Sequence, residues 1–294
     1  AEQTHGDAAK PRTGQHRHRP PQLPGLGKLL PAAGGGRRSG LDLPFQIGLG
    51  LAGHVPAAFL RRDVDDLMAQ RTLGVTVSDL AAMGATPIGF TLALTLPQAG
   101  ADWLAAFAGG LNQAAERHGL RLIGGDTTRG DWVFNVTIIG ELPCGSALRR
   151  SGAQVGDDIW VSGHIGAAAA GLAAMQGKLP LPAEVEAACR LKLHRPQPRV
   201  ALGQRLLDIA TAAMDVSDGL AQDLGHILRA SGVGACLQAT EVPALAELKA
   251  SLAEETLHAL QLSGGDDYEL LFTAPENARE AVEAAGRAAD VAVS

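Results

Sequence analysis

The 294-residue chain has few cysteines, few aromatic residues and no long hydrophobic run. Its three cysteines are an odd number, widely spaced and without a Cys-x-x-Cys pair: Cys144, Cys189 and Cys236. This spacing argues against a disulfide framework or a zinc site, and it favours buried, reduced thiols in a cytoplasmic protein. No apolar run reaches the ~18 residues of a membrane-spanning helix, and the first residues lack the apolar core of a signal peptide.

Aromatic residues make up only 3% of the chain, so we expect a core built from Ala, Leu, Val and Ile. The formal charge of −6 gives no reason to expect a nucleic-acid partner. The length predicts about two domains.

Three catalytic signatures are missing from the sequence. It has no Gly-x-x-x-x-Gly-Lys-Ser/Thr loop, no His-Arg-Asp loop and no Gly-x-Ser-x-Gly elbow. These absences exclude a P-loop nucleotide enzyme, a protein-kinase-type site and an α/β-hydrolase nucleophile.

Acidic stretches beside small or hydroxylic residues are what the chain does contain. The most prominent is Asp-Val-Ser-Asp-Gly at 215–219, which follows an apolar run and precedes a helical pattern. Three others are Ser-Asp-Leu at 78–80, Gly-Gly-Asp-Thr-Thr-Arg-Gly at 124–130 and Gly-Gly-Asp-Asp-Tyr-Glu at 264–269. A single Asp-Gly is usually a turn. Four such stretches predict loops that converge on phosphate and on Mg²⁺, which prefers carboxylate and phosphate oxygens.

Each stretch also has a structural interpretation that the sequence leaves open. Asp215 and Asp218 would cap the helix that follows them. Asp79 would lie on a solvated helix face, and residues 124–128 would form a hairpin turn. Arg150 is either a bidentate phosphate ligand or an exposed linker side chain.

The first 62 residues differ from the rest of the chain. They carry nine Lys/Arg against three acids, they are rich in Pro and Gly, and they show almost no periodicity. This shift predicts a boundary, with either a disordered basic tail or an out-of-frame stretch before it. His16 and His18 alone do not make a metal site, and His164 and His194 are interpreted as structural.

Regular patterns begin at residue 63 and predict two α/β domains, at 63–144 and 145–294. Residues 120–123 are predicted as a short buried strand that leads into the Gly-Gly-Asp loop. The second domain is expected to be cut short at its end. Further elements are predicted as helices at 67–82, 101–118, 167–175, 184–193 and 276–289 and as strands at 88–96, 132–142, 158–162, 232–237 and 268–272.

The acidic motifs, together with Arg-Ser-Gly-Ala at 150–153, occur in an order that resembles thiamine-monophosphate kinases of the aminoimidazole ribonucleotide synthetase-like superfamily. The resemblance implies an α/β (α+β) fold of two domains, with an N-terminal domain that dimerises. It implies Mg²⁺-dependent transfer of the γ-phosphoryl group of ATP to thiamine monophosphate, with no catalytic side chain beyond those that position charge.

The resemblance also implies residue roles. Asp79, Asp126, Asp215 and Asp218 would hold Mg²⁺. Gly125, Asp126, Arg150 and Ser217 would contact ATP. Asp266 stands at a substrate-contacting position where the family commonly has Glu.

Two acidic stretches of the family, Gly-Asp-Asp and Ser-Thr-Asp-Thr, are absent from residues 1–62. Their loss implies fewer ligands for Mg²⁺ and weak or absent kinase activity, with nucleotide binding partly kept. Two alternatives follow: an impaired or non-catalytic nucleotide-binding remnant, and a sister-family ATP-dependent synthetase.

Overall fold

The computed structural model describes residues 27–31, 65–98 and 100–294. Most of the segment predicted to be disordered lies outside the described residues. Strand β1 (Gly27–Pro31) is the part of this segment that the structure describes, and it pairs along its whole length with Val233–Leu237.

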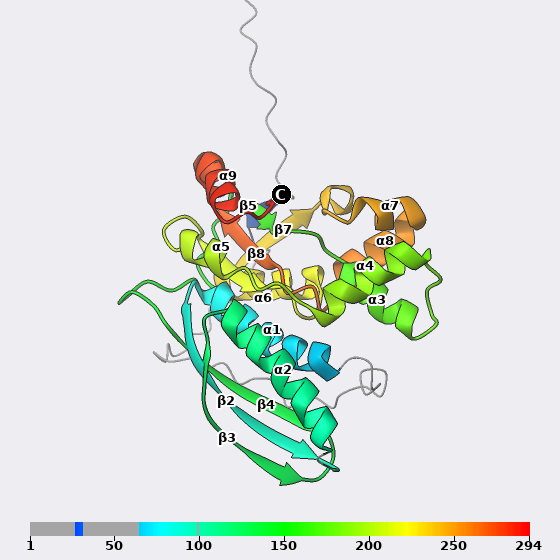
Figure 1. Cartoon of the computed structure of the whole chain (residues 1–294). Coiled ribbons are helices and arrows are strands. Elements are labelled where there is room, and N and C mark those ends of the chain that lie inside the picture. Colours follow the sequence, from blue (N-terminus) through cyan, green and yellow to red (C-terminus); the bar gives the residue numbers. More distant parts are fainter. Residues whose placement is uncertain (1–26, 32–64, 99) are drawn as a thin grey trace, which may run out of the picture.

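The N-terminal unit is a three-stranded sheet covered by two helices (Figure 1). Its elements are α1 (Asp65–Met83), β2 (Thr86–Leu96), α2 (Ala101–Arg117), β3 (Arg121–Arg129) and β4 (Val133–Glu141). The strand order is β3-β2-β4, with β2 parallel to β3 and antiparallel to β4. The parallel pair requires a crossover, and α2 supplies it. The helix predicted at 67–82 and the strand predicted at 88–96 are confirmed.

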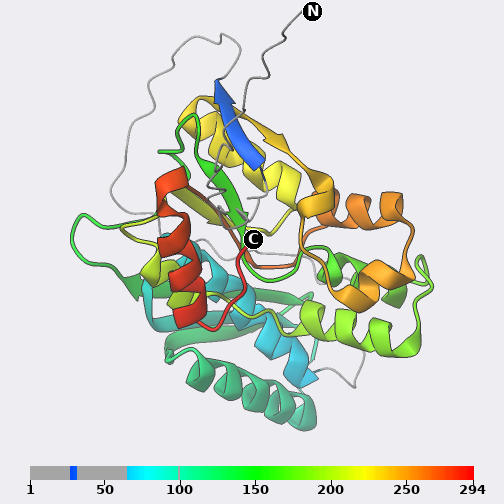
Figure 2. The ribbon, with the colours of Figure 1, turned by 90° about the horizontal axis from the view of Figure 1, so that it is seen from above.

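The C-terminal unit contains a five-stranded sheet in the order β6-β8-β5-β1-β7, in which every pairing is antiparallel (Figure 2). Its other strands are β5 (Asp158–Val161), β6 (Ala212–Asp215), β7 (Val233–Leu237) and β8 (Leu270–Ala274). Its helices are α3 (Ala167–Met175), α4 (Ala183–His194), α5 (Val200–Arg205), α6 (Leu220–Ser231), α7 (Ala246–Ser251), α8 (Glu254–Ser263) and α9 (Arg279–Ala288), with short 3₁₀ turns at Ala239–Glu241 and Glu276–Ala278. Both units therefore mix helices with a sheet, as expected.

Helix α1 joins the two units, because it covers the N-terminal sheet and also packs against α4, α5 and β6. Ala81 on α1 belongs to the same buried cluster as Phe272 on β8. A Cβ at Gly203 of α5 would come within 2.0 Å of the Ala81 carbonyl oxygen. Only glycine allows α5 to lie this close to α1, and this contact helps to hold the two units together.

The strand predicted at 120–123 is present, but it is longer than predicted, and the prediction that it is buried is wrong. Strand β3 runs from Arg121 to Arg129 and is exposed at every residue, including Leu122 at 55% and Ile123 at 59%. It is the edge strand of the described sheet, so one of its two sides has no neighbouring strand there. The Gly-Gly-Asp segment consequently lies within a strand and not in a loop or hairpin turn.

The few aromatic residues are concentrated in the N-terminal core. Trp103 stacks on Phe107 with ring centroids 5.0 Å apart, and Trp132 stacks on Phe134 at 6.0 Å. The core is otherwise aliphatic, as the composition predicts.

The cysteines are free thiols, but the prediction that they are buried holds only for Cys189. Cys144 and Cys236 are exposed. Within the part of the chain that the structure describes, every helix is too short or too polar to cross a bilayer.

Candidate active site

Asp215, the last residue of strand β6, lies at the candidate active site. The carboxyl of Asp215 is buried, with 6% of the residue exposed, and Ser217 and Asp218 follow in the turn before α6. The N-cap of α6 is Gly219, with no side-chain cap. Asp218 instead accepts a hydrogen bond of 3.1 Å from Gln222 Nε2. The helix-cap interpretation of Asp215 and Asp218 is therefore not what the structure shows.

Asp223 fixes the turn, a role that the sequence analysis missed. Its Oδ2 accepts the backbone N–H groups of Ser217, Asp218 and Gly219 at 2.9, 3.1 and 3.2 Å. The side chain is buried in α6. The sequence does contain a signal for this role, because Asp223 is an acid four residues after the glycine that precedes the helix. This contact holds the Asp-x-Ser-Asp-Gly segment in one conformation.

Asp79 on α1 lies close enough to Asp215 and Arg150 for their charges to act on it. Burial, followed by the carboxylate of Asp215, raises the pKa of Asp79 to about 6, while Arg150 opposes this shift. Burial also raises the pKa of Asp215. Ionising these two neighbouring carboxyl groups is costly, and a bound cation would stabilise their charged forms. The pair therefore fits a role in binding Mg²⁺.

The acidic loop before β8 is joined to the Asp-x-Ser-Asp-Gly segment by backbone hydrogen bonds. The N–H of Asp266 donates to the Ser217 carbonyl at 2.9 Å, and that of Tyr268 donates to the Val216 carbonyl at 2.8 Å. A Cβ at Gly265 would lie 2.2 Å from the Ser217 oxygen, so this position has no room for a side chain. The two predicted loops thus form one structural unit.

The side chain of Asp266 is held by two groups. Arg71 Nη2 from α1 donates to Asp266 Oδ1 at 2.6 Å, and the Tyr268 hydroxyl donates to the same oxygen at 3.3 Å. Asp266 and Tyr268 adopt positive φ angles of 73° and 51°, which cost energy for non-glycine residues. Arg71, which the sequence analysis did not single out, is therefore a positioning contact from the other unit.

The remaining acids of this loop have internal partners. Asp267 accepts the N–H groups of Gly166 and Ala168 at 2.7 and 3.2 Å, next to the start of α3. Glu269 forms a bidentate pair with Arg199, with both distances 2.6 Å. These two acids stabilise the C-terminal unit and are not available as metal ligands.

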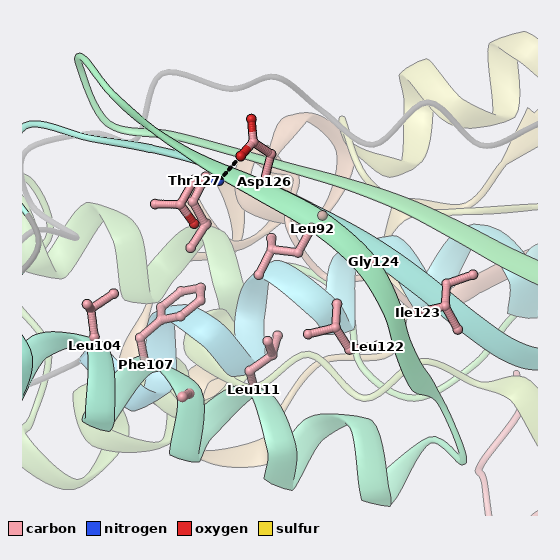
Figure 3. Close-up of a pocket in the computed structure, with 12 residues that line it drawn as sticks. Leu92, Leu104, Phe107, Leu111, Leu122, Ile123, Gly124, Asp126 and Thr127 are labelled. Carbon is pink, nitrogen blue, oxygen red and sulfur yellow. Dashed lines mark hydrogen bonds between the residues drawn. The ribbon is translucent and has the colours of Figure 1, made fainter.

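Gly125 and Asp126 lie on β3, beside a groove of about 750 Å³ between β3 and α2 (Figure 3). Asp126 is exposed, and its Oδ1 accepts the N–H of Thr127 at 2.8 Å. Leu92 and Phe107 lie along the same groove.

The four predicted metal ligands are not all gathered in one place. Across residues 65–98 and 100–294, no three Asp, Glu, His or Cys side chains come together as a metal cluster. The structure brings Asp79, Asp215 and Arg150 together, whereas Asp126 is exposed on β3 and Asp218 is exposed in the turn that follows Asp215.

The two-unit fold and its acidic segments place the chain in the class of AIR synthase related proteins. Residues 51–142 match the family model described as "AIR synthase related protein, N-terminal domain", and residues 154–293 match the model of the corresponding C-terminal domain.

Comparisons with individual proteins show to which family within this class the chain belongs. The thiamine-monophosphate kinase of Salmonella typhimurium (strain LT2) is 46% identical over 225 residues, covering 76% of this chain and 69% of that protein. The crystal structure of the kinase from Stenotrophomonas maltophilia K279a has a TM-score of 0.74 at 47% identity, covering 78% of this chain and 74% of that one. AaThiL complexed with AMPPCP and TMP has a TM-score of 0.68 at 29% identity, covering 75% and 72%. The chain therefore belongs to the thiamine-monophosphate kinase family, and the resemblance is confirmed.

Hydrogenase maturation protein HypE, at 22% identity and a TM-score of 0.62, shares only the fold. A sister-family synthetase or a non-catalytic remnant is not favoured by these comparisons.

Proposed function

We propose that the chain transfers the γ-phosphoryl group of ATP to thiamine monophosphate, giving thiamine diphosphate. The observation that carries the proposal is the similarity to a kinase complexed with AMPPCP and TMP. The junction of the two acidic loops at Ser217 and Asp266 supports it, because this junction lies beside the Asp79–Asp215 pair.

The carboxylates of Asp79 and Asp215, with those of Asp126 and Asp218, would hold Mg²⁺. When bound, Mg²⁺ neutralises charge on the polyphosphate oxygens. The inclusion of Asp126 and Asp218 rests on the family pattern.

Four residues would contact the nucleotide: Gly125, Asp126, Arg150 and Ser217. The Arg150 guanidinium is exposed and can bind phosphate oxygens bidentately. Ser217 offers a hydroxyl on a turn that Asp223 holds in place. A Cβ at Gly125 would come within 2.0 Å of the Leu92 carbonyl oxygen, so the glycine allows β3 to lie against β2, and its proposed contact with ATP rests on the family pattern.

Transfer is proposed to be direct, without a covalent enzyme intermediate. Phosphoryl transfer depends on alignment and on charge neutralisation more than on a nucleophilic side chain. Asp266, oriented by Arg71 and Tyr268, would contact thiamine monophosphate.

A homodimer formed through the N-terminal sheet is part of the proposal. Large hydrophobic side chains of this sheet are exposed: Ile88 at 44%, Ile123 at 59% and Ile139 at 43%. Such a surface is unusual on a monomer and typical of an interface. Sedimentation of the Ile139→Asp variant tests this: we expect a dimer-to-monomer shift, and an unchanged mass would contradict the dimer model.

Calorimetry tests the nucleotide site. ATP should bind more tightly with Mg²⁺ than in EDTA, and Asp215→Asn should remove most of the difference. Equal affinity in both buffers would contradict the proposed role of the acidic segments.

A further inference from the structure

A second groove, of about 800 Å³, lies between the two units on a different set of elements. It is bordered by the end of α2, by α4 with the loop that follows it, and by α5. None of the residues that line it belongs to the four acidic stretches. The groove is therefore separate from the proposed catalytic site.

The lining of this groove is basic. Arg117 and His118 come from the N-terminal unit, and Lys192 and Arg195 come from the C-terminal unit. No Asp or Glu is among its described lining residues. Burial, followed by the charge of Arg117, lowers the pKa of His118 to about 4, so its imidazole is neutral near pH 7. Three permanent cations thus face one cavity.

Cations near the end of α4 would in part simply complement the helix dipole. That role does not explain Arg195, because its Nε is buried and has no hydrogen-bond partner within the described residues. A buried donor on a charged group is costly to leave unpaired. An anion bound in the groove would supply the missing acceptor.

Apolar side chains form the rest of the wall. Leu191 is 53% exposed, and Pro198, Val200 and Leu245 also line the cavity. Guanidinium and ammonium groups beside an apolar wall fit a ligand that has an anionic end and an apolar body.

We propose that this groove is a binding site for a small organic phosphate, distinct from the catalytic site. The phosphate binds Arg195 and Lys192, and the apolar body lies against Leu191 and Pro198. Because Arg117 and His118 come from the other unit, the ligand contacts both units and stabilises one arrangement of them.

The test uses phenyl phosphate as the probe, titrated by calorimetry into the full chain in EDTA. Without a divalent cation the acidic segments repel anions, so binding there is suppressed. We expect saturable binding that weakens at least tenfold in the double variant Lys192→Gln/Arg195→Gln. Inorganic phosphate should bind more weakly than phenyl phosphate, because it lacks the apolar body.

Two matched variants separate the groove from the rest of the molecule. Arg190→Gln removes a charge from the same helix outside the groove, where Arg190 pairs with Glu186 at 3.6 Å, and should leave binding unchanged. Ala188→Trp keeps every charge but fills the groove, and should abolish binding. Binding that is absent in the unmodified chain, or that stays at the level of the unmodified chain in Ala188→Trp or in the double variant, would overturn the proposal. Equal loss in Asp126→Asn would assign the binding to the catalytic site instead.

Discussion

Arg71 and Asp266 form an ion pair of 2.6 Å that connects the two units of the molecule. Arg71 lies on α1, where its guanidinium also donates to the Leu193 carbonyl at the end of α4. Asp266 lies in the strained loop that is bonded to the Asp-x-Ser-Asp-Gly segment. The orientation of the proposed substrate contact therefore depends on a side chain from the opposite unit.

Replacing Arg71 by Met should raise the KM for thiamine monophosphate about tenfold, because a hydrogen bond to a charged group contributes roughly 1.5–3 kcal/mol. The KM for ATP should change much less, and Arg71→Lys should restore part of the loss. Steady-state kinetics with each substrate varied in turn would measure this. Equal effects on both KM values would indicate a general loss of structure.

Asp215→Asn should lower kcat by about 100-fold or more, as expected when a group that neutralises developing charge is removed. The same variant should unfold at a higher denaturant concentration, because burial makes the Asp215 carboxylate costly in the folded chain. Asp218→Asn should lower kcat with little change in stability, since Asp218 is exposed. Wild-type turnover in both variants would contradict their role in binding Mg²⁺.

Glu269→Gln should destabilise the chain by about 3 kcal/mol, because it leaves the charge of Arg199 without its partner at a buried site. Glu269 is 3% exposed, and it also accepts a hydrogen bond of 2.6 Å from Ser162 Oγ. Urea unfolding measures the loss. The matched control is Glu186→Gln, which removes an exposed pair with Arg190 and should cost no more than about 0.5 kcal/mol.

The folded chain should lose stability through His194 as the pH falls from 6.5 toward 4. Burial, followed by the charges of Arg71 and Arg190, lowers the pKa of His194 to about 4. The neutral imidazole is thus favoured on folding, whereas the unfolded chain takes up a proton near pH 6.5. The stability is present above pH 6.5 and is lost below it, by up to about 3 kcal/mol. His194→Gln should flatten this part of the curve, while the same change at the partly exposed His258 should not.

Much of the architecture follows from local patterns. The helix at α1 and the strands at β2 and β4 show clear periodicity and short connections, and each appears within a few residues of its prediction. The exposure of β3 could not be predicted from the local sequence pattern. Leu122 and Ile123 have the composition of a core strand, but their exposure is decided by the position of β3 at the edge of the sheet.

The acidic motifs were visible in the sequence, whereas their partners were not. Asp266 was singled out by its motif, but Arg71 is 195 residues away and is brought to it by tertiary packing. Asp223 resembles an ordinary helical acid until its three backbone contacts are seen. Residues whose function depends on contacts between distant segments carry no local signal.

The most direct test of the central claim is the formation of thiamine diphosphate from thiamine monophosphate and ATP, followed by chromatography. We predict slow product formation that requires Mg²⁺, consumes one ATP per product, and falls about 100-fold or more in Asp215→Asn. Failure to form thiamine diphosphate at any Mg²⁺ concentration, or equal formation in EDTA, would contradict the account.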